Sequence, residues 1–133
     1  MISKTFIAKD ENLDPVITFI HTVLPSECKA EILNKIDLAV EEIFINIAHY
    51  AYDAKEGNAE ISCSFENNNL CVEFADTGVQ FNPLQKEDPD ITKPLEERDI
   101  GGLGIFLTKQ FMDSVDYKYE NNKNILTIQK RIE

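Results

Sequence analysis

The chain has 133 residues and a formal net charge of −11, with 13 Lys and Arg against 24 Asp and Glu. This length predicts one domain with a single hydrophobic core, and 43% hydrophobic with 28% charged residues is typical of a soluble globular protein. The negative charge argues against nucleic acid as a partner, because phosphate groups are bound by basic surfaces.

The sequence shows no sign of a membrane span or of secretion. No apolar run reaches membrane-spanning length, and the first residues lack the apolar core of a signal peptide. The three cysteines, Cys28, Cys63 and Cys71, have neither paired spacing nor the spacing of metal ligands. We therefore expect reduced thiols in a cytoplasmic protein.

The chain is predicted to begin with a strand and a helix. Residues 2–9 alternate loosely and predict a short strand at a sheet edge. A helix is predicted from about residue 12 to residue 24, with Asn12 as its cap and Pro15 in its first turn. The side chains expected to face inward are Val16, Phe19, Ile20 and Val23.

A longer helix is predicted from about residue 27 to residue 53. Ser26 is its expected N-cap, and Gly57 with Asn58 is expected to end it. No Gly or Pro interrupts its second half, and two apolar lines there predict a helix covered by protein on most sides. The main apolar line is Ile36, Val40, Ile43, Ile47 and Ala51.

One polar stripe runs along this helix. Glu42, Asn46, His49 and Asp53 follow each other at spacings of four, three and four, which places them on one side. Burying a carboxylate or carboxamide without a partner costs on the order of a few kcal/mol. The stripe is therefore either the solvated face of the helix or the lining of a polar cleft. His49 is more readily explained as a structural histidine than as a catalytic one.

Two hairpins are predicted in the rest of the chain. Residues 59–66 and 70–75 alternate as strands and are joined by a turn of three asparagines at 67–69. The C-terminal pair has strands around residues 115–119 and 126–132, joined by a turn at residues 121–124.

The first hairpin ends in Asp76-Thr77-Gly78, most commonly a simple turn. The functional alternative uses the Asp76 carboxylate to accept a ligand N–H, with Gly78 allowing a flat ring to approach the backbone. An aspartic protease would need two such carboxylates on a nearly all-β chain. The long predicted helices disfavour that reading.

Between the hairpins lies an irregular, acidic segment followed by glycines. Residues 79–100 contain three prolines and an excess of acidic residues, which is typical of a functional lid or a disordered segment. Gly101-Gly102-Leu103-Gly104 then opens a helix whose predicted apolar line is Leu103, Phe106, Leu107 and Phe111. Glycines at a helix start can bind an anion, although the pattern is neither a P-loop nor a Rossmann fingerprint.

Taken together, these motifs resemble the ATP-binding domain of the gyrase/Hsp90/histidine-kinase/MutL superfamily. Within it, the chain is most similar to the anti-sigma-factor serine/threonine kinases, through the runs AVEEIFINIAHYAY, DTGVQFNP and GGLGIFLTK. The resemblance covers nearly the whole chain and implies an α/β fold, a Bergerat-type α+β two-layer sandwich. A mixed, mostly antiparallel sheet would be covered on one face by three helices. Residues 1–133 would form a single domain with an ATP lid at about residues 79–100.

The resemblance also implies roles for individual residues. Asn46 would bind Mg²⁺ through its side-chain oxygen, and Glu42 would accept a proton from the attacking hydroxyl or water. Asp76 would bind the adenine amino group, with Gly78 giving the base room. The remaining residues implied at the nucleotide are Arg98, Gly101, Gly102, Leu103, Gly104 and Thr127. Asn82 departs from the family pattern, which more often has Asp at this position.

The function implied is that of an ATP-dependent serine/threonine protein kinase that also sequesters a partner. Its expected partners are a sigma factor and an anti-anti-sigma protein of the STAS type, and the family suggests a homodimer. The alternative is an ATP-gated interaction module that transfers no phosphate. The catalytic domain of a histidine kinase is disfavoured, because 133 residues leave no room for a phosphoacceptor-helix domain.

Overall fold

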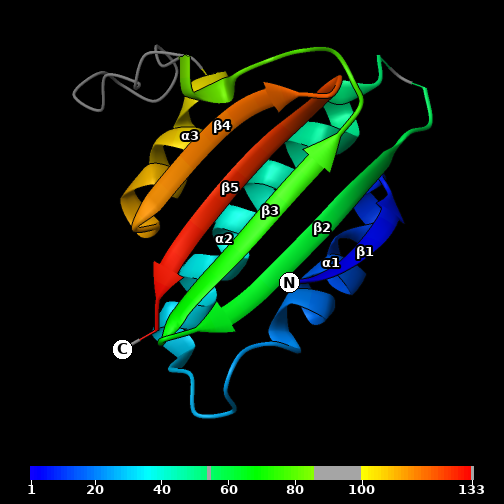
Figure 1. The fold of residues 1–133 in the computed structure, drawn as a ribbon. Helices are drawn as coiled ribbons and strands as arrows, with labels where there is room; N and C mark the ends of the chain where they lie inside the picture. The colour runs from blue at the N-terminus through cyan, green and yellow to red at the C-terminus, as the bar shows by residue number, and fades with distance from the viewer. Residues whose placement is uncertain (54, 86–99, 133) are drawn as a thin grey trace.

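One five-stranded sheet forms one layer of the protein. The computed structural model describes residues 1–53, 55–85 and 100–132, with only the backbone described at 100–103. The strand order is β1-β2-β3-β5-β4, and every described pairing is antiparallel, so the expected mixed sheet is not found (Figure 1). The strands are β1 (Ile2–Ile7), β2 (Asn58–Glu66), β3 (Asn69–Asp76), β4 (Ser114–Glu120) and β5 (Lys123–Arg131).

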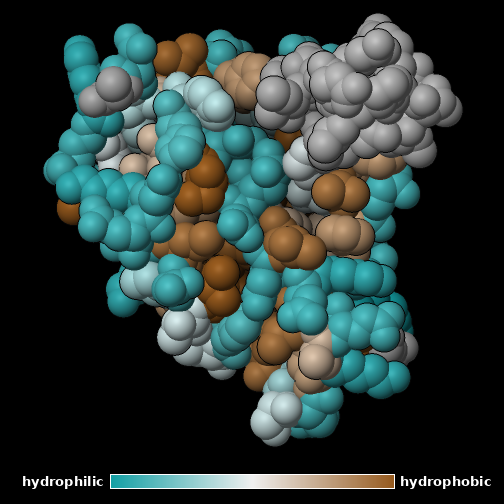
Figure 2. Space-filling model, turned by 180° about the vertical axis from the view of Figure 1, so that it is seen from behind, coloured by the Kyte–Doolittle hydropathy of each residue, from teal (hydrophilic) through white to brown (hydrophobic). Residues whose placement is uncertain are grey.

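Three helices, α1 (Leu13–His21), α2 (Ala30–Asn46) and α3 (Ile100–Phe111), form the second layer. All three lie on the same face of the sheet, which confirms the predicted two-layer α/β fold (Figure 1). Alternate strand residues, such as Ile61, Val72 and Phe74, are buried against this layer. Seen from the helix side, the surface is mostly hydrophilic with separate apolar areas (Figure 2).

Both helix starts predicted in the first third of the chain differ in detail from the structure. Asn12 precedes α1 as expected, but its Nδ2 donates to Ile7 O over 2.7 Å and does not cap the helix. The second helix, α2, begins at Ala30, three residues later than predicted. The reason is a turn after Pro25, in which Cys28 N donates to Pro25 O over 3.2 Å.

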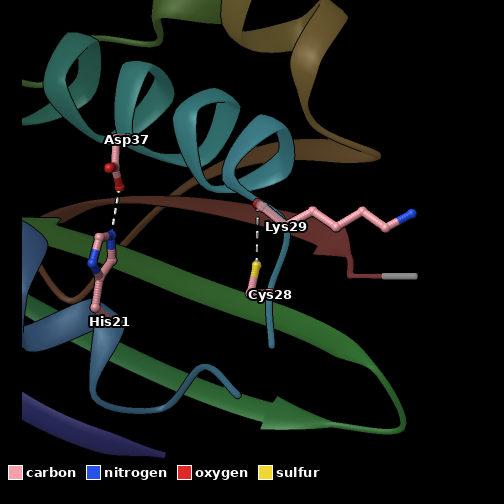
Figure 3. A network of polar contacts seen from close by, with 4 residues as sticks. All are labelled: His21, Cys28, Lys29 and Asp37. Atoms are coloured by element: carbon pink, nitrogen blue, oxygen red, sulfur yellow. Dashed lines mark hydrogen bonds and ion pairs between the residues drawn. The ribbon is translucent and has the colours of Figure 1, made fainter. Parts of the chain in front are cut away.

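Two histidine–aspartate pairs tie the N-terminal segment to the long helix. His21 of α1 lies 2.7 Å from Asp37 Oδ1 of α2 through its Nε2 (Figure 3). His49 Nε2 lies 2.7 Å from Asp10 Oδ1. The expectation that His49 has a structural partner is therefore confirmed.

The long helix ends differently from the prediction. After Asn46 it widens into one π-helical turn, η2 (Ile47–Ala51), and stops before residue 53. Asp53 then adopts a positive φ of 49° and reverses the chain, a role expected of Gly57, whose φ is not positive. A π turn inside an α-helix often marks a functional site.

Both predicted hairpins are confirmed, with tighter turns than expected. Asn67 and Asn68 have φ values of 53° and 61°, and Asn121 and Asn122 have values of 55° and 62°. Two consecutive residues with positive φ form the turn whose twist matches antiparallel strands, and asparagine tolerates this conformation. Each loop therefore has only two residues.

The buried face of α3 agrees only in part with the predicted one. Ile105 and Thr108 are buried and Phe111 packs partly buried against the core as expected, whereas Leu107, which was expected to face inward, is 40% exposed. The helix is rotated because Gly104 faces α2, which brings the two helices close together.

The described cysteines are all free thiols. Among the described residues, no helix combines the length and apolar character needed to cross a membrane.

Candidate functional site

A cavity of about 800 Å³ lies between α2 with η2, the end of β3, and residues 79–83. This volume is within the usual range for small-molecule sites, about 300–1,000 Å³. Its apolar walls include Ile43, Ile47, Phe74, Ile105 and Leu126. The polar side chains lining it are Glu42, Asn46, Tyr50, Asp53, Asp76, Gln80, Tyr117 and Asn124.

At one end of the cavity, Asp76 closes strand β3 and is only 7% exposed. Its Oδ1 accepts hydrogen bonds from Gly78 N and from Asn124 Nδ2, both at 3.0 Å. Burial raises the pKa of Asp76 above its usual value, and the two hydrogen bonds counteract part of that rise. Both of these hydrogen bonds go to Oδ1, and no donor from the described residues meets Oδ2.

At the other end, Glu42 and Asn46 lie one turn apart on α2. Asn46 Nδ2 donates to Glu42 Oε1 over 3.0 Å. This bond directs the amide nitrogen to Glu42 and leaves the Asn46 Oδ1 oxygen as the remaining ligating atom of that side chain. A hard oxygen ligand suits Mg²⁺, which commonly takes one or two protein ligands and completes its shell with phosphates and waters. The described residues contain no group of three His, Cys, Asp or Glu able to hold a metal by themselves.

Two glycines allow the cavity walls to approach closely. A Cβ at Gly104 would overlap the Glu42 carboxyl group, so this carboxyl lies directly against α3. A Cβ at Gly78 would overlap the Ala51 carbonyl, and the neighbouring Val79 N donates to that carbonyl oxygen over 2.8 Å. Gly78 is thus required for packing against η2, a reason that the sequence did not indicate.

Of the predicted polar stripe, Glu42, Asn46 and Asp53 line the cavity, and His49 does not. The cleft interpretation is therefore confirmed for three of the four residues. A π turn has about 4.4 residues per turn, so each residue rotates less than in an α turn, and the residue four positions after Asn46, not the one three positions after it, returns to its side. Tyr50, 71% exposed, lies at the cavity instead.

Thr127 was expected near the base, and the structure does not place it at the cavity. Inward-facing Asn124, Leu126 and Ile128 alternate with it on β5, so its side chain is on the opposite face of the sheet. Thr127 pairs in register with Glu73 and Asp116, not with Asp76.

Asn124 is the site residue that the sequence analysis missed. It is directly opposite Asp76 in the β3–β5 register. The alternation of Leu126 and Ile128, extended backward by two residues, would have identified it.

Several predicted site residues are not placed by the structure. Arg98 and most of the lid at 79–100 lie outside the described residues. Gly101, Gly102 and Leu103 belong to the first turn of α3, where only the backbone is described.

Asn82 Oδ1 accepts a hydrogen bond from Leu84 N over 2.9 Å, at the turn Pro83–Gln85.

The structure is an α/β domain with a cavity of small-molecule size, and comparison with known proteins gives the family. Residues 6–130 match the histidine kinase-like ATPase domain, and the chain belongs to this family.

Among curated relatives, the chain is 32% identical over 93 residues to the serine-protein kinase RsbW of Bacillus thuringiensis strain Al Hakam and of Bacillus cereus strain 03BB102. The match covers 67% of this chain and 58% of each relative, so the chain spans less than two thirds of their length.

Two solved structures share the fold at low identity. The histidine kinase domain from the Erythrobacter litoralis EL346 blue-light activated histidine kinase matches with a TM-score of 0.60 at 14% identity, covering 92% of this chain and 60% of that one. Acinetobacter baumannii histidine kinase AdeS matches with a TM-score of 0.54 at 13% identity, covering 100% of this chain and 70% of that one.

Proposed function

We propose that this chain binds ATP with Mg²⁺ in the cavity and transfers its γ-phosphate to a serine or threonine of a partner protein. The observation that carries the proposal is the shared cavity of Asp76 and the Glu42–Asn46 pair. Gly78, two residues after Asp76, packs on Ala51, and Ala51 follows Glu42 by nine residues, or roughly 13 Å along a helix. Asp76 and the Glu42–Asn46 pair therefore lie apart in the cavity. We call the end at Asp76 the base end and the end at Glu42 and Asn46 the phosphate end.

At the base end, the ionised Asp76 carboxylate accepts a hydrogen bond from the adenine amino group at Oδ2. Its other oxygen already has two donors, and Phe74 and Leu126 supply apolar walls for a flat ring. Asp76 is buried, so a ligand without a donor would leave this carboxylate oxygen unpaired. The site should therefore bind a ligand that donates a hydrogen bond to Asp76 much more tightly than one that does not.

At the phosphate end, the lining carries negative charge. Glu42 lines this end of the cavity, and no Lys or Arg of the described part of the chain lines the cavity. The Mg²⁺ that accompanies ATP would supply the missing positive charge, held by Asn46 Oδ1 together with phosphates and waters. The first-turn amides of α3, including those of Gly101, Gly102, Leu103 and Gly104, would hold phosphate oxygens, and Arg98 is a further candidate.

Glu42 acts as the general base in this proposal. The Asn46 amide holds one carboxylate oxygen, and the contact with Gly104 limits where the carboxyl group can move. The second oxygen accepts the proton of the attacking hydroxyl.

The partners follow from the relatives and from the family resemblance. The curated relatives are named as serine-protein kinases, and the anti-sigma-factor kinases that the chain resembles act between a sigma factor and a STAS-type anti-anti-sigma protein. We propose the same two partners here, with a homodimer as the assembly. The alternative is an ATP-gated interaction module without phosphoryl transfer.

The test combines calorimetry with transfer of labelled γ-phosphate to a serine or threonine of a cognate STAS protein. Wild type should bind ATP only weakly without Mg²⁺, and Asn46→Ala should lose the gain in affinity that Mg²⁺ provides. Asn34→Ala, an exposed position on the same helix, is the matched control. Binding of ATP and partner without any transfer would favour the interaction module, and no ATP binding would refute both functions.

A further inference from the structure

The buried side chain of Asn124 makes four hydrogen bonds at the base end of the cavity. Its Nδ2 donates to Asp76 Oδ1 over 3.0 Å and to Val79 O over 2.9 Å. Its Oδ1 accepts from Phe81 N over 3.0 Å and from the Tyr117 hydroxyl over 2.5 Å. All the hydrogen-bonding capacity of one amide is thus used, and Asn124 is only 7% exposed.

The orientation of this amide is determined by two backbone groups. Phe81 N–H can only donate and Val79 C=O can only accept. If the amide oxygen and nitrogen of Asn124 were exchanged, two donors would meet at Phe81 and two acceptors would meet at Val79. The nitrogen must therefore point to Asp76. Because Gly78 N donates to the same Asp76 oxygen, the hydrogen bonds of the protein converge on Oδ1 and leave Oδ2 to the ligand.

We propose, on the basis of the ATP-binding function inferred above, that Asn124 is a positioning residue that sets base selectivity through Asp76. Its Nδ2–H stabilises the ionised carboxylate in an apolar setting and holds it with Oδ2 toward the base. An ionised carboxylate only accepts hydrogen bonds, so the ring must donate at this point. The selected class is a purine with an amino group at position 6.

The same amide connects base recognition to the following loop. Residues Val79 and Phe81 lie at the start of the predicted lid at about residues 79–100, and both form hydrogen bonds with Asn124. The hydroxyl group of Tyr117 on β4 donates a hydrogen bond to the oxygen of the same amide. A change at position 124 therefore acts on the Asp76 carboxylate and the first lid residues together.

Asn124→Asp tests the proposal, because it keeps the shape and replaces the donor by an acceptor. The control is Gln129→Ala on the same strand, which removes a hydrogen bond to Asn69 on the other face of the sheet. Calorimetry would measure the dissociation constants of ATP and of purine riboside triphosphate, which lacks the 6-amino group. We expect the preference for ATP to fall by about 10- to 100-fold in Asn124→Asp and to be unchanged in the control.

The pH profile separates a positioning role from a general packing role. In Asn124→Asp, two carboxyl groups within hydrogen-bond distance cannot both ionise, and a shared proton replaces the lost donor. ATP affinity of this variant should rise as pH falls from about 9 to about 6, whereas that of wild type should not. Glu42, Asp53 and Tyr117 are further ionisable side chains that line the cavity. Both the variant and the wild type contain them, so they do not account for a difference between the two pH profiles.

The outcomes are distinct for the two proposals. Wild type that binds no ATP refutes the proposed function. Wild type that prefers ATP, with the same preference and pH profile in Asn124→Asp, overturns the positioning role alone. If Asn124→Asp does not fold, Asn124→Ala replaces it: loss of the ATP preference supports the role, and a preference equal to that of wild type overturns it.

Discussion

The two ends of the cavity are built in different ways. At the base end, Asp76 is held by bonds from its own turn and from β5, and Asn124 links it to Tyr117 of β4 and to the loop at residues 79–81. At the phosphate end, Glu42 and Asn46 bond to each other along one helix. The base end is thus a network across several elements, whereas the phosphate end is a pair on one element.

This difference indicates that the two ends have different roles in binding and in phosphoryl transfer. A network that fixes a buried carboxylate before the ligand arrives reduces the ordering cost of binding, which suits recognition. A pair whose remaining oxygens face the cavity suits a metal–phosphate group that brings its own ligands. Changes at the base end should therefore affect affinity, whereas changes at the phosphate end should affect transfer and, at Asn46, the part of the affinity that depends on Mg²⁺.

The largest effect is expected from Glu42→Gln. The amide fills the same space and keeps most ATP affinity, but it cannot accept the proton, so phosphoryl transfer should fall by roughly 10²–10⁴-fold. Glu41→Gln, the adjacent exposed carboxylate, is the control in the transfer assay. A Glu42→Gln protein with wild-type transfer would remove the general base from the mechanism.

Asp76→Ala should produce the next largest effect, on binding. Loss of a hydrogen bond to a charged group costs roughly 2–3 kcal/mol, which is on the order of 30- to 150-fold in dissociation constant. Calorimetry with ATP and Mg²⁺ measures it. Equal affinity in the variant and wild type would show that the base does not contact this carboxylate.

Gly104→Ala should disturb the contact between α3 and α2. The added methyl group would overlap the Glu42 carboxyl, which is the far end of a flexible side chain, so the loss of stability should lie at the low end of the about 1–3 kcal/mol typical of overpacking. Chemical denaturation measures the loss, and Gln110→Ala on the exposed side of α3 is the control. Transfer should fall more than stability, because the Glu42 carboxyl must move; wild-type transfer would mean that the displaced carboxyl is not the general base.

The smallest effect, of opposite sign, is expected from Asp76→Asn without nucleotide. Burial raises the folded-state pKa of Asp76, so stability is lost as pH rises from the ordinary carboxyl pKa through this raised value, and the loss is complete above it. An amide still accepts the bonds from Gly78 and Asn124 but carries no buried charge. The melting temperature should therefore exceed that of wild type by a few degrees at neutral pH.

The gain from Asp76→Asn should shrink as pH falls toward the ordinary carboxyl value, because wild-type Asp76 is then protonated as well. Thermal unfolding at a series of pH values follows this difference. A variant less stable than wild type at neutral pH would show that the ionised form is better solvated than its burial implies.

Much of the fold follows from local sequence. Alternating apolar residues predicted the strands of both hairpins, and asparagine-rich stretches predicted the places of their turns, because these preferences act over two to four residues; the turns themselves are shorter than predicted. The polar stripe with Glu42 and Asn46 could likewise be found from helical spacing alone. These features depend on neighbours in the chain, which the sequence contains directly.

Other features depend on contacts between distant residues, and only the tertiary structure decided them. The π turn at Ile47–Ala51 removes His49 from the stripe, and the contact between Gly104 and Glu42 sets the rotation of α3. The β3–β5 register brings Asn124, 48 positions further along the chain, to Asp76. Periodicity along one element gives its faces, but packing against other elements selects which residues meet, and that selection built the base end of the cavity.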